Sequence, residues 1–216
     1  MALQIQLEPH DSLLAGAFIA HWRAPLGRLP PLSEAEALLA SPIGSCKAVP
    51  APDATVRAAI RDMLRSRDFK PTGRAKPASE YLARASAEGG LRAINPAVDA
   101  CNAVSLHSGI PISVVDCERY SEPLQIRLGV AGESYVFNPT GQVIELAGLL
   151  CLVDAQGPCA NAIKDAQRTK TSESTRSSLS ILWSSRALAA QTAAALELYR
   201  TLLQEVAELE PVTLGA

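Results

Sequence analysis

The central segment of the chain, residues 91–116, places hydrogen-bonding side chains among apolar neighbours. Asn102 and Ser105 lie on or beside the apolar face of a predicted helix, and Ser113 and Asp116 belong to the predicted strand that follows. Buried amides and hydroxyls cost about 1–3 kcal/mol each unless they are paired. Two interpretations remain open: Asn102 and Ser105 tie neighbouring backbone together, or they line a polar pocket with Ser113 and Asp116.

A second polar concentration spans residues 165–176 and contains two acids, two arginines and three threonines. Loops with this density of charge and hydroxyls often bind anions or donate hydrogen bonds. We take Asp165, Arg168, Thr169 and Thr171 as candidate site residues. The alternative is that Asp165 and Arg168 form only a local ion pair, which contributes about 0–1 kcal/mol.

Standard catalytic motifs are missing from the sequence. There is no Gly-x-Gly-x-x-Gly, Walker A loop, Gly-x-Ser-x-Gly elbow or His-Glu-x-x-His. The three histidines have no metal-ligand spacing, so we predict neither a metal nor a cofactor. An enzyme built on this sequence would position a water molecule and polarise a carbonyl without an activated serine or cysteine.

The central segment must position Asn102, Ser105, Ser113 and Asp116. Its sequence predicts a capped helix, a tight break and a buried strand. Asn95 is a good N-cap and Pro96 suits the first helical position. Gly109 predicts the helix end, and Pro111 prevents the helix from resuming. The strand is expected over residues 112–115, with Asp116 at its carboxyl end.

Helical patterns dominate the chain before this segment. Alternating residues 3–7 predict an edge strand, and residues 12–23 predict a helix. A proline-rich connector with one short helix at 33–40 follows over 24–52. Further helices are expected at 54–68, where Asp53 is the cap, and at 78–87.

After the central segment the pattern changes to period two. Short strands separated by turn residues are expected at 124–130, 133–137, 142–146, 149–153, 158–163 and 178–183. A long helix is predicted over 186–210, where a seven-residue repeat predicts either a coiled-coil seam or, as we prefer, packing on its own domain. The predicted fold class is α+β: helices followed by a largely antiparallel, multi-stranded sheet, with a long C-terminal helix.

Composition is typical of a globular protein. The chain has 216 residues, 48% of them hydrophobic and only 4% aromatic. No apolar run reaches the roughly 20 residues of a membrane helix, and no signal peptide is recognised, so we expect no membrane contact. Five scattered cysteines without a Cys-x-x-Cys pair favour reduced thiols and a cytoplasmic location.

Charge is uneven along the chain. The net charge of −2 argues against nonspecific coating of nucleic acid, and we predict no DNA partner. Residues 57–92, however, hold nine Lys or Arg against four Asp or Glu. This segment is either a solvated helix face or a phosphate-contacting patch; the candidate tRNA contacts are Arg61, Arg65, Lys70, Arg74 and Lys76.

One family resemblance links these features. Residues 92–106 (RAINPAVDACNAVSL) and 109–116 (GIPISVVD) resemble the tRNA-editing domain in the β subunit of bacterial phenylalanyl-tRNA synthetase, and above all its free-standing relatives. The match extends over roughly 55–205. It implies an editing-like domain over 53–210, with residues 1–52 packed on it, and a tRNA partner bound by its acceptor end.

The resemblance also implies a pocket between the central segment and the 165–175 loop, with Asn102, Ser113, Asp165, Arg168, Thr169 and Thr171 as its lining. In the synthetase this domain hydrolyses mischarged tyrosyl-tRNA, with a histidine before the strand end and a glutamate on a late strand. This sequence has Ser113 in place of that histidine, and no acid near residues 182–184. Specificity for tyrosine is therefore not implied.

Three functions remain open. The first is a trans-acting aminoacyl-tRNA deacylase, with Ser113, Asp165 and Arg168 catalytic and five substrate-binding residues: Asn102, Ser105, Asp116, Thr169 and Thr171. The second is a non-catalytic module that binds an amino acid or a tRNA end, suggested by the missing histidine and glutamate. The third is an oligomeric partner protein, suggested by the repeat over 188–209; the sequence does not determine the oligomeric state.

Overall fold

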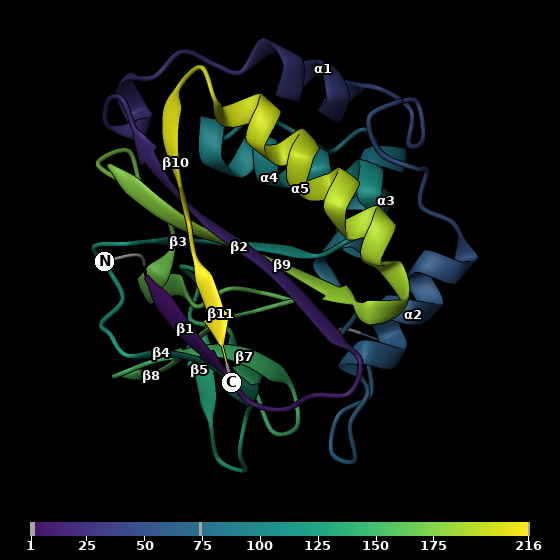
Figure 1. The fold of residues 1–216 in the computed structure, drawn as a ribbon, viewed down its shortest axis with the longest axis vertical. Helices are drawn as coiled ribbons and strands as arrows, with labels where there is room; N and C mark the ends of the chain where they lie inside the picture. The colour runs from purple at the N-terminus through teal and green to yellow at the C-terminus, as the bar shows by residue number, and fades with distance from the viewer. Residues whose placement is uncertain (1–2, 74, 216) are drawn as a thin grey trace.

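Two β-sheets and five α-helices surround one hydrophobic core in the computed structural model, which describes residues 3–73 and 75–215 (Figure 1). The five-stranded sheet has the order β11 (Thr213–Gly215), β1 (Gln4–Leu7), β4 (Leu124–Leu128), β7 (Leu150–Asp154) and β8 (Gly157–Asn161). The four-stranded sheet has the order β10 (Ala207–Pro211), β2 (Leu13–Trp22), β9 (Ser177–Ser185) and β3 (Ile112–Asp116). A separate hairpin joins β5 (Ser134–Val136) and β6 (Val143–Glu145).

The helices gather beside the four-stranded sheet, where Figure 1 shows them at the top and right. They are α1 (Ser33–Ala40), α2 (Ala54–Leu64), α3 (Ala78–Ala87), α4 (Pro96–Ser108) and α5 (Ala189–Leu203). Three short 3-10 turns complete the described elements: η1 (Leu26–Arg28), η2 (Gln167–Thr169) and η3 (Arg186–Leu188). Helix α5 packs on α4 and on strands β2 and β9, so the two helices cover one face of this sheet.

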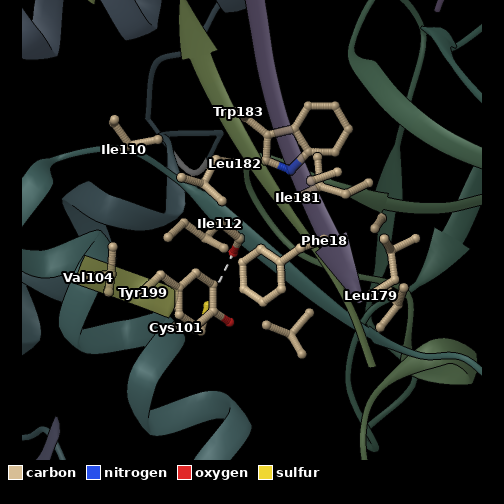
Figure 2. Close-up of a cluster of buried hydrophobic side chains, with 14 of the residues drawn as sticks. Phe18, Cys101, Val104, Ile110, Ile112, Leu179, Ile181, Leu182, Trp183 and Tyr199 are labelled. Atoms are coloured by element: carbon tan, nitrogen blue, oxygen red, sulfur yellow. Dashed lines mark hydrogen bonds between the residues drawn. The ribbon is translucent and has the colours of Figure 1, made fainter. Parts of the chain in front are cut away.

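Aromatic rings join α5 to the sheet. Phe18 of β2 meets Tyr199 of α5 edge to face, with ring centroids 4.9 Å apart, among the aliphatic side chains drawn in Figure 2. The Tyr199 hydroxyl lies 3.0 Å from Ser180 Oγ on β9, so each of these buried hydroxyl groups has a hydrogen-bond partner. The core is built mainly from alanine and aliphatic side chains, as the low aromatic content requires.

The central segment folds as predicted. Asn95 caps α4 by accepting a hydrogen bond from the Val98 N–H at 3.0 Å, and Pro96 occupies the first turn. Gly109 ends the helix in the left-handed conformation, with φ of 74°. A side chain there would be strained, and its Cβ would also lie 2.8 Å from Pro52 Cβ. The α+β fold class is likewise confirmed, and only the β1 pairings, with β4 and β11, are parallel among the described strands.

The cap at Asn95 can be tested directly. Asn95→Ala is expected to lower the free energy of unfolding by about 1 kcal/mol, because one N–H at the start of α4 loses its acceptor. Urea denaturation of the purified chain measures this change. Asn95→Asp supplies the same acceptor and should recover most of the loss; equal destabilisation by both variants would contradict the capping role.

Two predictions for the N-terminal segment are wrong. Residues 12–23 do not form a helix; Leu13–Trp22 is strand β2, paired with β9 along its length and with β10 at its end. Gly16 is unfavourable inside a helix, and aromatic and β-branched residues such as Phe18 and Ile19 favour a strand that has a partner on each side. Strand β1 is also not an edge strand, because it lies between β11 and β4. Residues 4–22 thus supply interior strands to both sheets.

The C-terminal helix is shorter than expected. It spans Ala189–Leu203, so the predicted helical residues 207–210 belong instead to strand β10; β11 (Thr213–Gly215) was not predicted. Helix α2 likewise ends at Leu64. The seven-residue repeat within α5 is buried against its own domain, as preferred, so it does not support a partner protein. Within the described residues, no helix combines the length and the apolar character needed to cross a membrane.

Candidate functional site

A cleft of about 340 Å³, here called the inner cleft, opens between the start of α4, the outer edge of β3 and the segment after β8. Apolar side chains line part of it: Ala78, Ile94, Val98, Cys101, Ile112, Val114 and Ile163. Polar and charged side chains line the rest: Asn95, Asn102, Asn161, Lys164, Asp165, Lys170 and Thr171. Such a mixture suits a small ligand that has an apolar side chain and a charged or polar end.

Asp165 is the acid of the inner cleft. Its Oδ1 accepts a hydrogen bond from Ser113 Oγ at 2.6 Å and one from the Asn161 N–H at 3.3 Å. Its Oδ2 accepts from the Val114 N–H at 3.3 Å. Burial raises the pKa of Asp165 to about 6, although these hydrogen bonds and the charge of Lys170 limit the rise. The carboxyl group therefore titrates close to neutral pH.

The edge position of β3 explains this contact. Strand β3 pairs on one side with β9 and has no neighbour among the described strands on its other side, so the outward Val114 N–H can reach Asp165. Side chains alternate along a strand, so Ser113 points to the opposite face from Ile112 and Val114, which line the cleft. Ser113 is 1% exposed and accepts a hydrogen bond from the Trp183 indole N–H at 2.9 Å. It supports Asp165 from behind the cleft.

Asn161 shapes the turn that carries Asp165. Its Oδ1 accepts hydrogen bonds from the backbone N–H groups of Ile163 and Lys164, at 2.8 and 2.9 Å. Its Nδ2 donates to the hydroxyl of Tyr135, which in turn donates to the Lys164 carbonyl at 2.5 Å. The sequence analysis did not select Asn161, which lies inside the strand predicted over 158–163, although an asparagine at the end of an apolar strand is a signal for such a turn.

Two lysines border the inner cleft, and neither was selected from the sequence. Lys164 Nζ lies 3.8 Å from the centroid of the Phe137 ring, in cation–π geometry. Lys170 Nζ donates to the Phe137 carbonyl at 2.6 Å. The cleft therefore combines one carboxyl group with two ammonium groups.

Arg168 does not line the inner cleft and does not pair with Asp165. Its two Nη atoms each donate at 2.8 Å to the carboxylate of Asp154, and Nη2 also donates to the Gly157 carbonyl at 2.9 Å. Thr169 is fully buried and donates to the Cys159 carbonyl at 2.9 Å. The 3-10 turn η2 points both side chains back at β7 and β8. The predicted local ion pair is therefore wrong, and so is the placement of these two residues in the pocket.

Ser105 and Asp116 also lie outside the inner cleft. Ser105 is one turn farther along α4 than Cys101, and its Oγ has no hydrogen-bond partner among the described residues. Asp116 is 2% exposed and accepts hydrogen bonds from Thr175 Oγ1 at 2.6 Å and from the Glu118 N–H at 3.0 Å. Asn102 and Thr171 do line the cleft. Across residues 3–73 and 75–215, no cluster of three His, Cys, Asp or Glu side chains is arranged for a metal ion.

The basic segment is partly neutralised. Arg61 forms two hydrogen bonds with the Glu80 carboxylate, at 2.6 and 2.7 Å. Arg65 lies 3.7 Å from Asp62 at an exposed site, where such a pair contributes little. Lys70 is exposed and Lys76 is half-buried. The remaining predicted tRNA contact, Arg74, lies outside the described residues.

Comparison with known proteins identifies the family. A family model described as the B3/4 domain matches residues 67–205, which is more than half of the chain. The chain belongs to the B3/4 domain family. This match includes α4, β3, Asn161 and Asp165, and therefore most of the inner cleft.

Similar proteins are phenylalanine–tRNA ligase β subunits. That of Thiobacillus denitrificans is 33% identical over 97 residues, which is 44% of this chain and 12% of that protein. That of Pasteurella multocida is 32% identical over 73 residues, which is 34% of this chain and 9% of that protein. The B3/4 chain thus spans about a tenth of the length of these relatives.

A solved structure has the same fold. An N-terminal fragment of the phenylalanyl-tRNA synthetase β subunit from Pyrococcus horikoshii superposes with a TM-score of 0.51, over 98% of this chain and 52% of that fragment. The sequence identity is 11%, so this likeness concerns the fold alone.

Proposed function

We propose that this B3/4 protein is a trans-acting aminoacyl-tRNA deacylase, which hydrolyses the ester between a wrong amino acid and the 3′ end of a tRNA. The observation that carries the proposal is the carboxyl group of Asp165, which is hydrogen-bonded and borders a cleft that suits an amino acid. The family relationship to synthetase subunits supports tRNA as the partner. A cytoplasmic location, where charged tRNA is used, is part of the proposal.

In this mechanism Asp165 is the general base. Water attacks the ester carbonyl carbon while the Asp165 carboxylate takes its proton; the bond to the ribose oxygen then breaks, and that oxygen regains a proton. A base with a pKa near 6 is largely ionised at pH 7 and still basic enough to accept the proton. The ammonium groups of Lys164 and Lys170 border the same cleft, where they would stabilise negative charge that develops on the carbonyl oxygen.

The remaining residues of the proposal have supporting roles. Asn102 and Thr171 line the cleft and would orient the amino acid. Ser113 becomes a positioning residue for Asp165, because its own hydroxyl is buried and already bonded. Arg168 becomes a positioning residue for the loop after β8. The exposed basic side chains Arg65 and Lys70 would contact the acceptor stem.

The alternative is a non-catalytic module that binds an amino acid or the end of a tRNA. Ser113 stands where the synthetase domain has a histidine, and none of the described residues that line the inner cleft is a histidine. The lack of this histidine favours binding without hydrolysis. The two functions differ in whether the ester survives binding.

Incubation of the purified chain with a panel of mischarged tRNAs, followed by acid precipitation of the remaining aminoacyl-tRNA, tests the proposal. We expect at least one mischarged species to lose its amino acid faster than in buffer, and the cognate species to remain intact. If every ester survives at enzyme concentrations equal to that of tRNA, the deacylase proposal fails. Ligand-induced thermal stabilisation with an intact ester would then establish the binding module.

A further inference from the structure

A second hollow adjoins the inner cleft. This outer groove, of about 780 Å³, lies between Thr72 and Ala75 on one side and the β5–β6 hairpin on the other. Its lining consists of Thr72, Ala75, Phe137, Gln142, Val143, Ile144, Glu145 and Lys164. Lys164 lines both hollows, so the two meet at this side chain. The outer groove is open and more polar, whereas the inner cleft is smaller and more apolar.

Phe137 is the aromatic side chain of the outer groove. It is only partly buried, and it follows strand β5 directly. Its backbone is fixed from two sides: its N–H donates to the Gln142 carbonyl at 3.0 Å, and its carbonyl accepts from Lys170 Nζ. Its ring holds the ammonium group of Lys164 at 3.8 Å. A fixed, partly exposed ring beside a cation is the arrangement on which nucleobases stack.

We propose that the outer groove is a nucleoside subsite, which binds the terminal base of the tRNA against Phe137 while the esterified amino acid occupies the inner cleft. The inference rests on the proposed function, because it assumes an aminoacyl-tRNA ligand. An amino acid esterified to a terminal ribose lies directly beside its nucleoside. A ligand of this kind needs two hollows that meet at one point, and Lys164 marks that point.

The charges around the outer groove determine the direction in which the bound RNA strand runs. Glu145 lies on the hairpin side and repels phosphate, so the uncharged base belongs there. Thr72 and Ala75 line the opposite wall, and the exposed Lys70 and the half-buried Lys76 lie within two residues of them in the sequence. The phosphates of the preceding nucleotides therefore run along this second wall, where lysine ammonium groups can neutralise them.

Binding of short RNAs to the full chain tests the subsite. The probes are the trinucleotide cytidylyl-cytidylyl-adenosine and the same molecule without its terminal base, each titrated by calorimetry. The wild type is expected to bind the complete probe about tenfold more tightly, the scale of base–aromatic stacking. Phe137→Leu should abolish this preference, Phe137→Tyr should retain it, and Phe69→Leu, a change of the same type at a residue that lines neither hollow, should leave it unchanged.

The outcomes separate this inference from the deacylase proposal. Equal affinity of the wild type for the two probes, or an unchanged preference in Phe137→Leu, overturns the subsite, even if mischarged tRNA is hydrolysed. A base preference that depends on Phe137, without any hydrolysis, supports the subsite and rejects the deacylase. When hydrolysis does occur, Phe137→Leu is expected to raise KM about tenfold and to change kcat less. The comparison of the two probes uses only the wild-type protein, so it remains valid even if a variant misfolds.

Discussion

Replacing Asp165 by asparagine is expected to lower kcat/KM for deacylation by at least about 100-fold, the usual contribution of a general base. Asparagine has nearly the same shape and can still accept hydrogen bonds from Ser113 and from the Asn161 N–H. It cannot take a proton from water. A loss of activity without a loss of tRNA binding, measured on the same mischarged tRNA, is the result that assigns the chemistry to this carboxyl group.

The pH dependence should follow from the same group. Because burial raises the pKa of Asp165 to about 6, the basic form increases between pH 5 and pH 7, and kcat/KM should increase with it and then level off. The effect on stability has the opposite sign. The unfolded chain loses this proton at lower pH than the folded chain, so ionisation of Asp165 reduces the free energy of unfolding as the pH rises. Asp165→Asn should remove both dependences.

Asp116 provides the matched control. It is a buried carboxylate at the end of β3 that lies outside the inner cleft. Asp116→Asn disturbs a buried hydrogen bond with Thr175 and should reduce stability, with activity nearly unchanged below the unfolding temperature. If Asp116→Asn and Asp165→Asn reduce kcat/KM equally, the effect of Asp165 is structural rather than catalytic.

Local signals were sufficient to predict the centre of the fold. The cap at Asn95, the glycine at position 109 and the proline at position 111 act within a few residues of the helix they delimit, and α4 and β3 form where they predict. The alternating strands after residue 124 were found for the same reason. Asp165, Asn102 and Thr171 line one cleft, and the family resemblance had joined the two distant segments that carry them; their roles stay a prediction.

Contacts between residues that are far apart in the sequence determined the features that the sequence analysis did not predict. Residues 13–22 form a strand because β9, more than 150 residues later, supplies its ladder. Arg168 carries the charge expected of a site residue, but its carboxylate partner is Asp154, not the nearer Asp165. Ser113 has the expected hydroxyl, yet the pairing of β3 with β9 turns it to the face behind the cleft. For Arg168 and Ser113 the residue type was informative, but only the tertiary structure determined where each side chain points.

The pair formed by Arg168 and Asp154 leads to a large expected effect on stability. The Asp154 side chain is fully buried, and Arg168 is its guanidinium partner. Removal of one partner from such a pair typically costs about 3–5 kcal/mol, because it leaves a buried charge without compensation. We expect Arg168→Ala to lower the free energy of unfolding near the lower end of this range, since the Ser121 and Gln156 N–H groups still donate to Asp154.

Urea denaturation at several pH values measures this effect. Burial would raise the pKa of Asp154, but the hydrogen bonds from Arg168, Gln156 and Ser121 outweigh it and hold the pKa below its ordinary value. The stabilisation is therefore present above the ordinary carboxyl range and is lost as the pH falls, so the difference between wild type and Arg168→Ala should shrink in acid. Arg65→Ala, at an exposed pair, should change stability by about 0–1 kcal/mol.

Arg168 and Asp165 should also differ in the kind of effect they have. The guanidinium group of Arg168 ties the β7–β8 end to the turn that follows Asp165, so its loss destabilises the fold first and activity only through the position of that loop. Arg168→Lys keeps the charge but not the paired hydrogen bonds, and should recover only part of the stability. If Arg168→Ala is as stable as the wild type and yet inactive, Arg168 acts on the substrate directly, and its role as a positioning residue is wrong.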